Sequence, residues 1–442
     1  MFTPVTSRYP IQPGRRFPAR PPPARLAALG FALCLAVVGS AGAQTRQVFV
    51  SSASGSANFS SWPSATPGAV GLEAADSICR NLATTAGLAR PDAFRAWLSD
   101  SLDDAWCRVQ DVTGTRDSAC DGATALPGAG PWARIGDGGR WGGRLTALIE
   151  QQGPLLPLDR TELGAPVPDL DLYWTGTDET GRAYDRLASE LCADWTSNAA
   201  GAFTLLGSTF ETRLNWTTSF GGSCDSWRHL VCLETGVGAI QPQVATLGPA
   251  ALAFVTSRVG SGNLASWPGA DGLSGLAAAD AVCHREAAAF HLPSPLTFVA
   301  WLSTSTLDAS SRLPTGLAWR RLDGTGIAAG RADLLDGRLA APINQIPAGA
   351  YLPQPPEWTA PMWTGTAFDG TRLPGETCLD WTSTSDVDSG LVGSANSAAA
   401  DWTDGRPFPC SALVPLYCFS TAEMLFWGIF ESGDALDWSP HT

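Results

Sequence analysis

The sequence predicts a mixed α+β fold built from two tandem copies of one disulfide-bonded domain. Two trios of cysteines recur along the chain with the same separations, 32 and 8 residues. The trios are Cys192, Cys224 and Cys232, and Cys378, Cys410 and Cys418. A further cysteine precedes each trio on a helix-like stretch, Cys79 in the first copy and Cys283 in the second. A cysteine spacing that repeats in this way indicates a duplicated domain in which each copy has its own disulfides.

Residues 1–43 have the composition of a secretory signal peptide. Five arginines are spread over residues 8–25, and the apolar run at 26–38 is too short to span a bilayer. Ala41-Gly42-Ala43 forms a small-residue cleavage site, so we expect the mature chain to begin at Gln44. No later stretch of the sequence is long and apolar enough for a membrane helix, which predicts a secreted or surface-located protein.

Charge and cysteine content limit the expected partners and compartment. The chain has a formal net charge of −14 at pH 7 and contains no lysine. Such a surface repels polyanions, so we expect neither nucleic acid nor heparin as a partner. Ten of the 11 cysteines follow the signal peptide. Disulfides are the default state of such cysteines in an oxidising compartment.

Each copy is expected to open with a strand and continue into a helix. The segments FVSS at 49–52 and FVTS at 254–257 combine aromatic and β-branched residues, which favour strands. Apolar residues that step by three and four then predict one face of a helix. That face comprises Leu72, Ala75, Cys79, Leu82 and Ala86. FRAWL at 94–98 and FVAWL at 298–302 predict a second strand, and Gly-, Ser-, Thr- and Trp-rich short strands and turns follow.

The spacing of equivalent residues locates an insertion in the first copy. The offset between the copies is 204 at the helix cysteines but 187 at Trp132 and its counterpart. The first copy therefore carries 17 extra residues between Ser99 and Trp132. Cys107 and Cys120 lie in this stretch without counterparts in the second copy, so we expect them to pair with each other.

These observations divide the chain into five parts. They are a signal peptide at 1–43, copy 1 at 44–235, a linker at 236–250, copy 2 at 251–420 and a C-terminal tail at 421–442. The tail holds an apolar run at 424–430 and continues with Glu431-Ser432-Gly433-Asp434, like a short C-terminal signature of many exported bacterial proteins. A sorting motif is one interpretation of the tail. An extra strand packed on copy 2 is the other.

Four repeated cysteines in each copy allow three pairings. A domain whose first helix and last strand both carry a cysteine often packs its ends side by side, which favours a nested pattern. The nested pairs are Cys79–Cys232 and Cys192–Cys224 in copy 1, and Cys283–Cys418 and Cys378–Cys410 in copy 2. The outer bridges close very long loops, and the chain-entropy estimate for such loops is about 4–5 kcal/mol each.

Five motifs together resemble the endostatin-like branch of the C-type lectin-like fold. They are the Ala-Ala-Asp-x-x-Cys helix at 74–79 and 278–283, the Ala-Trp-Leu-Ser strand, the Trp-x-Gly-x-x-x-x-Gly strand, Cys-x-x-Trp at 192–195 and 378–381, and the closing Cys-x-x-x-x-x-x-x-Cys at 224–232 and 410–418. The likeness covers nearly all of both copies and is greatest to bacterial secreted domains that have no assigned function. The resemblance implies two tandem C-type lectin-like domains with the nested pairing. Animal endostatin-type domains bind heparin through arginine patches, and the acidity of this chain argues against that activity.

The resemblance also suggests calcium as a ligand. In C-type lectins, Glu-Pro-Asn and Trp-Asn-Asp segments supply oxygens to Ca²⁺, a cation that takes six to eight of them. Copy 2 has Asp401-Trp402-Thr403-Asp404 near the place of the second segment, but neither copy has Glu-Pro-Asn. The candidate calcium ligands are Asp369, Glu376, Asp401 and Asp404. The alternative is that these are solvated loop acids.

The 18 tryptophans divide into recurring and single positions. Four recurring pairs are expected in the cores: Trp97/Trp301, Trp174/Trp363, Trp195/Trp381 and Trp216/Trp402. Four tryptophans without a partner are candidates for a ligand-binding surface: Trp106, Trp141, Trp227 and Trp358.

The motifs favour a binding protein over an enzyme. The sequence contains no nucleophile elbow, no His-Glu-x-x-His zinc motif and no phosphate-binding P-loop. We therefore expect a secreted, non-catalytic binding or adhesion protein that presents two lectin-like domains to an extracellular ligand such as a glycan or a matrix protein. The alternative is an extracellular carbohydrate-active hydrolase that uses two acidic loop residues.

Overall fold

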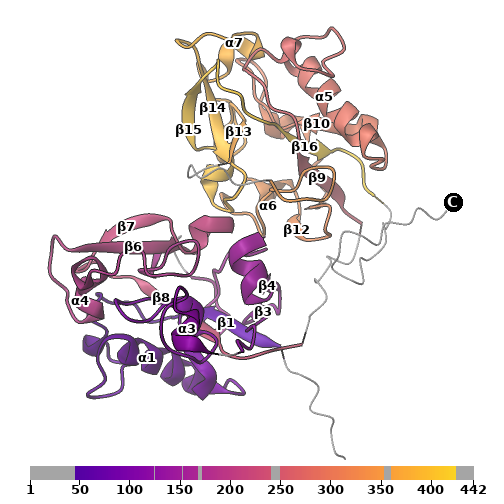
Figure 1. The fold of residues 1–442 in the computed structure, drawn as a ribbon. Helices are drawn as coiled ribbons and strands as arrows, with labels where there is room; N and C mark the ends of the chain where they lie inside the picture. Colours follow the sequence, from indigo (N-terminus) through magenta and orange to yellow (C-terminus); the bar gives the residue numbers. More distant parts are fainter. Residues whose placement is uncertain are drawn as a thin grey trace, which may run out of the picture. The chain divides into compact units, whose positions relative to one another are not determined.

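The computed structural model describes residues 45–123, 125–151, 153–167, 172–239, 249–352 and 360–424. Within these ranges the chain is a mixed α+β protein with two copies of one domain (Figure 1). The elements of copy 1 are β1 (Arg46–Val50), α1 (Gly71–Thr85), β2 (Phe94–Ala96), α2 (Ala105–Arg108), α3 (Ala119–Gly122), β3 (Trp132–Arg134), β4 (Arg140–Gly142), β5 (Leu172–Trp174), α4 (Cys192–Trp195), β6 (Phe203–Ser208), β7 (Phe220–Ser223) and β8 (His229–Glu234). Those of copy 2 are β9 (Ala251–Val255), α5 (Gly275–Ala289), β10 (Phe298–Ala300), β11 (Trp319–Arg320), β12 (Gly326–Ala328), α6 (Arg331–Leu334), β13 (Pro361–Trp363), α7 (Cys378–Trp381), β14 (Ser389–Ser394), β15 (Arg406–Pro409) and β16 (Tyr417–Ser420).

The strands of copy 1 form one mixed sheet in the order β4-β3-β1-β8-β5-β6-β7, and β2 also pairs with β8. The first and last strands are antiparallel neighbours, with Phe49 opposite Cys232. The sheet is mixed because β1 is parallel to β3 and β5 is parallel to β8. The two ends of the copy therefore meet in the middle of its sheet.

Copy 2 has the same strand order, but its sheet is divided in two, as β10-β16-β9-β11-β12 and β13-β14-β15. In copy 1 the parallel contact between β5 and β8 includes His229. The equivalent position in copy 2 is Pro415, which has no backbone N–H to donate. Only a single bridge, between Trp363 and Leu416, remains there. One proline thus accounts for the main difference in sheet assignment.

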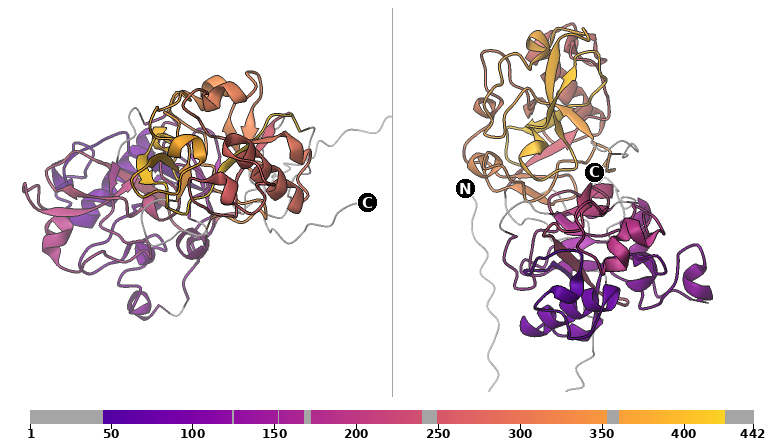
Figure 2. Two further views of the ribbon diagram at one scale, coloured as in Figure 1. Left: turned by 90° about the horizontal axis from the view of Figure 1, so that it is seen from above. Right: turned by 90° about the vertical axis from the view of Figure 1, so that its left-hand side faces the viewer.

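The long helix of each copy packs on one side of the strands (Figures 1 and 2). The buried face of α1 includes Ala75 and Cys79, as predicted, while Leu72 and Leu82 are half-buried against the core. Ala74 and Ile78 are also buried, so the buried face is wider than the predicted stripe. Among the described helices, none is long and apolar enough to cross a membrane.

All five expected disulfides are present. The outer bridges, Cys79–Cys232 and Cys283–Cys418, join each long helix to the last strand. The inner bridges are Cys192–Cys224 and Cys378–Cys410, and Cys107–Cys120 is the additional bridge of copy 1. Each copy therefore has the nested pattern.

The recurring tryptophans are core residues, as predicted. In three of the four pairs, the two members make equivalent hydrogen bonds in the two copies. Trp97 and Trp301 each donate from Nε1 to a threonine hydroxyl 2.8 Å away. The indoles of Trp174, Trp195 and their counterparts donate to backbone carbonyls at 2.7–3.0 Å. Each of these six indoles thus satisfies its only donor, which fixes its orientation in the core.

Copy 2 extends beyond its predicted end at residue 420. The N–H of Thr421 donates to the carbonyl of Thr297 at 2.9 Å, and that of Met424 donates to Ala250 at 3.1 Å. The Met424 side chain is buried in the core of copy 2. The first four residues of the predicted tail therefore belong to the domain. Residues 425–442, like the signal peptide and linker residues 240–248, lie outside the described residues.

Candidate functional site

The structure corrects the expected surface position of two tryptophans. Trp141 is fully buried and packs edge-on against Trp216, with ring centroids 5.1 Å apart. Trp106 is also buried, and the guanidinium of Arg116 lies 3.9 Å from its ring centroid. Trp227 is 70% exposed, whereas Trp358 lies outside the described residues. Trp106 and Trp141 are therefore core residues of copy 1, although copy 2 has no tryptophan at either position.

The four candidate calcium ligands do not form a metal-ligand group. Among the described residues, no group of three or more His, Cys, Asp or Glu side chains is placed to hold a metal ion. Asp369 instead accepts from the hydroxyl and N–H of Thr371 at 2.6 and 3.0 Å, and these bonds lower its pKa.

Of the other three acids, two accept hydrogen bonds from neighbouring loop residues and one has a buried oxygen. Asp404 accepts from the N–H of Phe368 at 3.2 Å. Asp401 accepts from the Ser397 hydroxyl, and burial raises its pKa. Glu376 has a buried oxygen without a hydrogen bond among the described residues. Asp369, Asp401 and Asp404 thus accept hydrogen bonds from loop residues, but only Asp369 is exposed as the alternative of solvated loop acids expects.

The structure places the insertion of copy 1 more narrowly than the sequence did. Arg108 and Arg312 are equivalent, because each donates to the alanine carbonyl of its second strand and to the aspartate of its long helix. The offset of 204 therefore continues to Arg108, and the additional residues follow it, within 109–131. Cys107 is then aligned with Ser311, so only Cys120 lies in the inserted segment itself.

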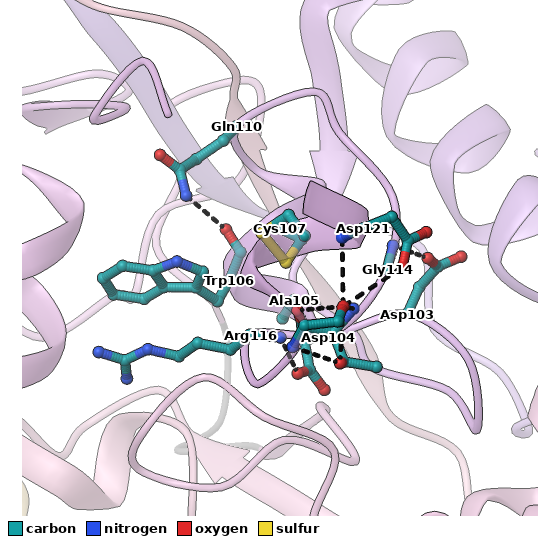
Figure 3. Close-up of a disulfide and its surroundings, with 12 residues drawn as sticks. Asp103, Asp104, Ala105, Trp106, Cys107, Gln110, Gly114, Arg116 and Asp121 are labelled. Carbon is teal, nitrogen blue, oxygen red and sulfur yellow. Dashed lines mark hydrogen bonds between the residues drawn. A yellow bond between two sulfur atoms is a disulfide. The ribbon is translucent and has the colours of Figure 1, made fainter. Parts of the chain in front are cut away.

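The inserted segment is held to the domain at several points (Figure 3). The Cys107–Cys120 disulfide joins it to α2. The N–H of Arg116 donates to the buried carboxylate of Asp104 at 2.7 Å, and that of Gly114 donates to Asp103. These bonds fix the segment beside the start of α2.

An ion pair beneath this region is common to both copies, buried in copy 1 and half-buried in copy 2. Arg108 Nη2 donates to Asp76 Oδ1 at 2.6 Å, and Arg312 Nη2 lies 2.6 Å from Asp280 Oδ2. Asp76 and Asp280 also each accept the N–H of the alanine that ends the second strand, at 2.9 Å. The recurring aspartate of the helix is therefore structural, because it fixes the helix to the strand.

Copy 1 has a charged pocket above this ion pair. It has a volume of about 320 Å³. Its lining residues are Leu72, Glu73, Asp76, Arg95, Asp103, Arg108, Asp111, Val112 and Thr113. Arg95 crosses it, with Nη2 2.8 Å from Asp111 and Nε 3.6 Å from Asp76. Residues 111–113 lie within 109–131, the stretch that contains the additional residues of copy 1, so this stretch forms one wall of the pocket.

The residues of copy 2 at the same positions have lost most of the charge. Glu73, Arg95 and Asp103 correspond to an alanine, a valine and a leucine. The stretch that forms one wall, within 109–131 of copy 1, is shortened to 313–318 in copy 2. Only the common Asp–Arg pair remains.

Sequence reasoning did not find this pocket, although one signal was present. Aligning the two copies residue by residue reveals three neighbouring charge differences on α1, β2 and the following turn. The contribution of Asp111 was not readable, because only the folded insertion brings it beside Arg95.

The comparisons with known proteins do not place the chain in a family. No protein-family model matches it, and no curated protein does.

Proposed function

We propose that this chain is a secreted, non-catalytic binding protein made of two endostatin-like, C-type lectin-like domains, and that copy 1 carries the ligand site. Five disulfides support an extracellular location, because such bonds persist in oxidising compartments. The resemblance of the motifs and the duplicated mixed sheet support the class of domain.

One observation carries the assignment of the site to copy 1. The two copies agree in their nested disulfides, their tryptophan core and their helix–strand ion pair, which are features of folding. They differ around the pocket, where copy 1 has charged residues and an inserted segment held by a disulfide. Loops on a rigid scaffold commonly carry recognition, so the region that differs is the expected place for a ligand.

The test compares the purified mature chain with a variant whose pocket resembles copy 2. The variant is Glu73→Ala, Arg95→Val and Asp103→Leu. Because copy 2 has these residues on the same scaffold, we expect the variant to fold, and its thermal unfolding checks this. The control variant changes three exposed residues outside the pocket: Glu179→Ala, Asp225→Leu and Arg285→Val.

Each protein is applied to an array of glycans and extracellular matrix proteins, with and without calcium. The proposal expects specific binding by the natural chain and the control variant, and its loss in the variant that resembles copy 2. Equal binding by all three proteins contradicts a site in the copy 1 pocket. Turnover of an array glycan would favour the hydrolase alternative instead.

A further inference from the structure

We propose that the copy 1 pocket binds an organic cation with several N–H donors, a guanidinium or a primary ammonium group. This inference rests on the proposed function, because it names a ligand class for the same site. It follows from the hydrogen-bonding capacity that the lining residues leave unused, from their charge and from the volume they enclose.

The two arginines of the pocket have most of their donors committed to the protein. Arg108 donates through Nη1 to the carbonyls of Ala96 and Leu98 at 2.9 and 2.8 Å, and through Nη2 to Asp76. Arg95 donates through Nη1 to two carbonyls and through Nη2 to Asp111. An anionic ligand would have to compete with these bonds, so the arginines do not form a ready anion site.

The carboxylates, in contrast, have acceptor capacity to spare. Within the described part of the chain, Glu73, Asp103 and Asp111 each use one side-chain oxygen in a hydrogen bond, with Arg80, Gly114 and Arg95 as donors. A carboxylate offers about four lone-pair positions over its two oxygens. The ligand that complements this lining therefore donates hydrogen bonds.

The charge of the lining also favours a cationic ligand. Four carboxylates, of Glu73, Asp76, Asp103 and Asp111, face two guanidinium groups. The lining has a formal excess of two negative charges, which Arg80, the partner of Glu73 outside the lining, reduces to one, and this excess attracts a cation. The Glu73 and Asp111 side chains are 66% and 61% exposed and form the rim, while Asp76 is buried at the floor.

Volume and spacing favour an organic cation over a bare metal ion. A cavity of about 320 Å³ is at the lower end of the range for small-molecule sites, roughly 300–1,000 Å³. Within the described ranges no three acids are placed to hold a metal ion, so these carboxylates surround a space without converging on one point. A planar guanidinium has five N–H donors and can reach several carboxylates at once.

Two sources can supply this chemistry, a free small molecule or an arginine or lysine side chain of another protein. The experiment uses three probes against the full mature chain, with binding measured by isothermal titration calorimetry. Agmatine represents a free cation and the peptide amide Gly-Arg-Gly a side chain. The third probe is the same peptide with citrulline, whose neutral urea group keeps the shape of the guanidinium and removes its charge.

The variants are Glu73→Gln and Asp111→Asn, which keep side-chain size and remove a charge at the rim. The matched control is Asp117→Asn, an exposed acid of the same insertion that does not line the pocket. We expect the arginine peptide to bind at least about tenfold more tightly than the citrulline peptide, since hydrogen bonds to charged groups are the strong ones. Each rim variant should weaken binding about tenfold, and the control less than about twofold.

The outcomes of these titrations decide the class of the ligand and its source. Binding of agmatine as well as the arginine peptide supports the cation class and a free small molecule, and binding of the peptide alone supports the class and a protein side chain. Equal binding of the citrulline peptide overturns the inference, as does the absence of binding by both cations. In that case the array experiment still tests the proposed function, because binding of another ligand that depends on the pocket would support a ligand site in copy 1.

Discussion

Arg108 lies beneath the charged pocket of copy 1 and donates from Nη2 to Oδ1 of Asp76 at 2.6 Å. Their side chains are only 7% and 10% exposed. Asp76 also accepts a hydrogen bond from the N–H of Ala96, so a single carboxylate joins α1, β2 and α2. The same arrangement in copy 2 lacks the charged rim, which separates the structural part of the region from the part assigned to a ligand.

Asp76→Ala should destabilise copy 1 by about 3–5 kcal/mol, because it leaves the buried Arg108 without its ionic partner. Asp280→Ala should cost less, since the Asp280 side chain is 24% exposed. Urea unfolding of the two variants measures the difference. The exposed pair Asp117–Arg182 provides the control, and Asp117→Ala should change stability by about 0–1 kcal/mol. A cost below about 1 kcal/mol for Asp76→Ala would show that the pair is not structural.

Cys107→Ser with Cys120→Ser should loosen the insertion and leave copy 2 unchanged. The bridge closes a loop with a sequence separation of 13 residues, and the chain-entropy estimate for a loop of about this size is about 3 kcal/mol. Limited proteolysis should then cut within 109–131 faster than in the natural chain. Unchanged cleavage would mean that the hydrogen bonds of Asp103 and Asp104 are sufficient to hold the segment.

Glu211 should make the stability of the protein depend on pH. Burial raises its pKa to about 8, and one of its buried oxygens has no hydrogen bond among the described residues. Because the folded pKa lies above the unfolded value of 4.5, the stabilisation of the protonated form is fully present below pH 4.5. It is lost as the pH rises toward about 8, by up to about 1.4 kcal/mol per pH unit.

Glu211→Gln should remove this dependence, so the variant gains stability relative to the natural chain as the pH rises from 5 to 8. Urea unfolding at several pH values measures the difference between the two proteins. Glu179→Gln, at an exposed position, is the control and should run parallel to the natural chain. If the stability of Glu211→Gln also changed with pH in parallel with that of the natural chain, the result would contradict the raised pKa of Glu211.

Two truncations should separate the end of copy 2 from the tail. A chain ending at Ser420 loses the buried Met424 side chain and the backbone bonds of Thr421 and Met424, so we expect it to be less stable by about 2–4 kcal/mol. A chain ending at Met424 keeps these contacts and should match the full chain in thermal unfolding. If residues 425–442 are a sorting motif, this second truncation also shifts the protein between cell surface and medium. Equal stability of both truncations would place the domain end at Ser420 after all.

The sequence predicted the features that repeat. Equal cysteine spacings indicated that each copy has its own disulfides, and a cysteine on both the first helix and the last strand favoured the nested pairs that the structure confirms. Recurring tryptophans indicated the core, because a duplicated domain keeps what its folding requires. A residue that appears in one copy only carries no such constraint. Trp141 is an example: strand register aligns it with Ile327, also buried, so this single tryptophan is a larger side chain at a core position.

The candidate site was harder to predict, for physical reasons. Aspartates in loops readily accept bonds from nearby backbone N–H groups, as Asp369 does, so their position in the sequence does not indicate whether they face a ligand. The pocket depends on Asp111, which the folding of the insertion brings to Arg95, 16 residues away along the chain. That approach is tertiary and leaves no spacing to recognise.

The most direct test of the account locates the ligand on the full chain. Hydrogen exchange, followed by mass spectrometry, is measured with and without the tightest-binding ligand from the array. We predict that the ligand slows exchange at the start of α1, in β2 and in the turn and insertion at 100–116. The equivalent segments of copy 2 at 275–280 and 298–312 should exchange as before. Equal protection in the two copies, or protection confined to other parts of the chain, would contradict the assignment of the site to the copy 1 pocket.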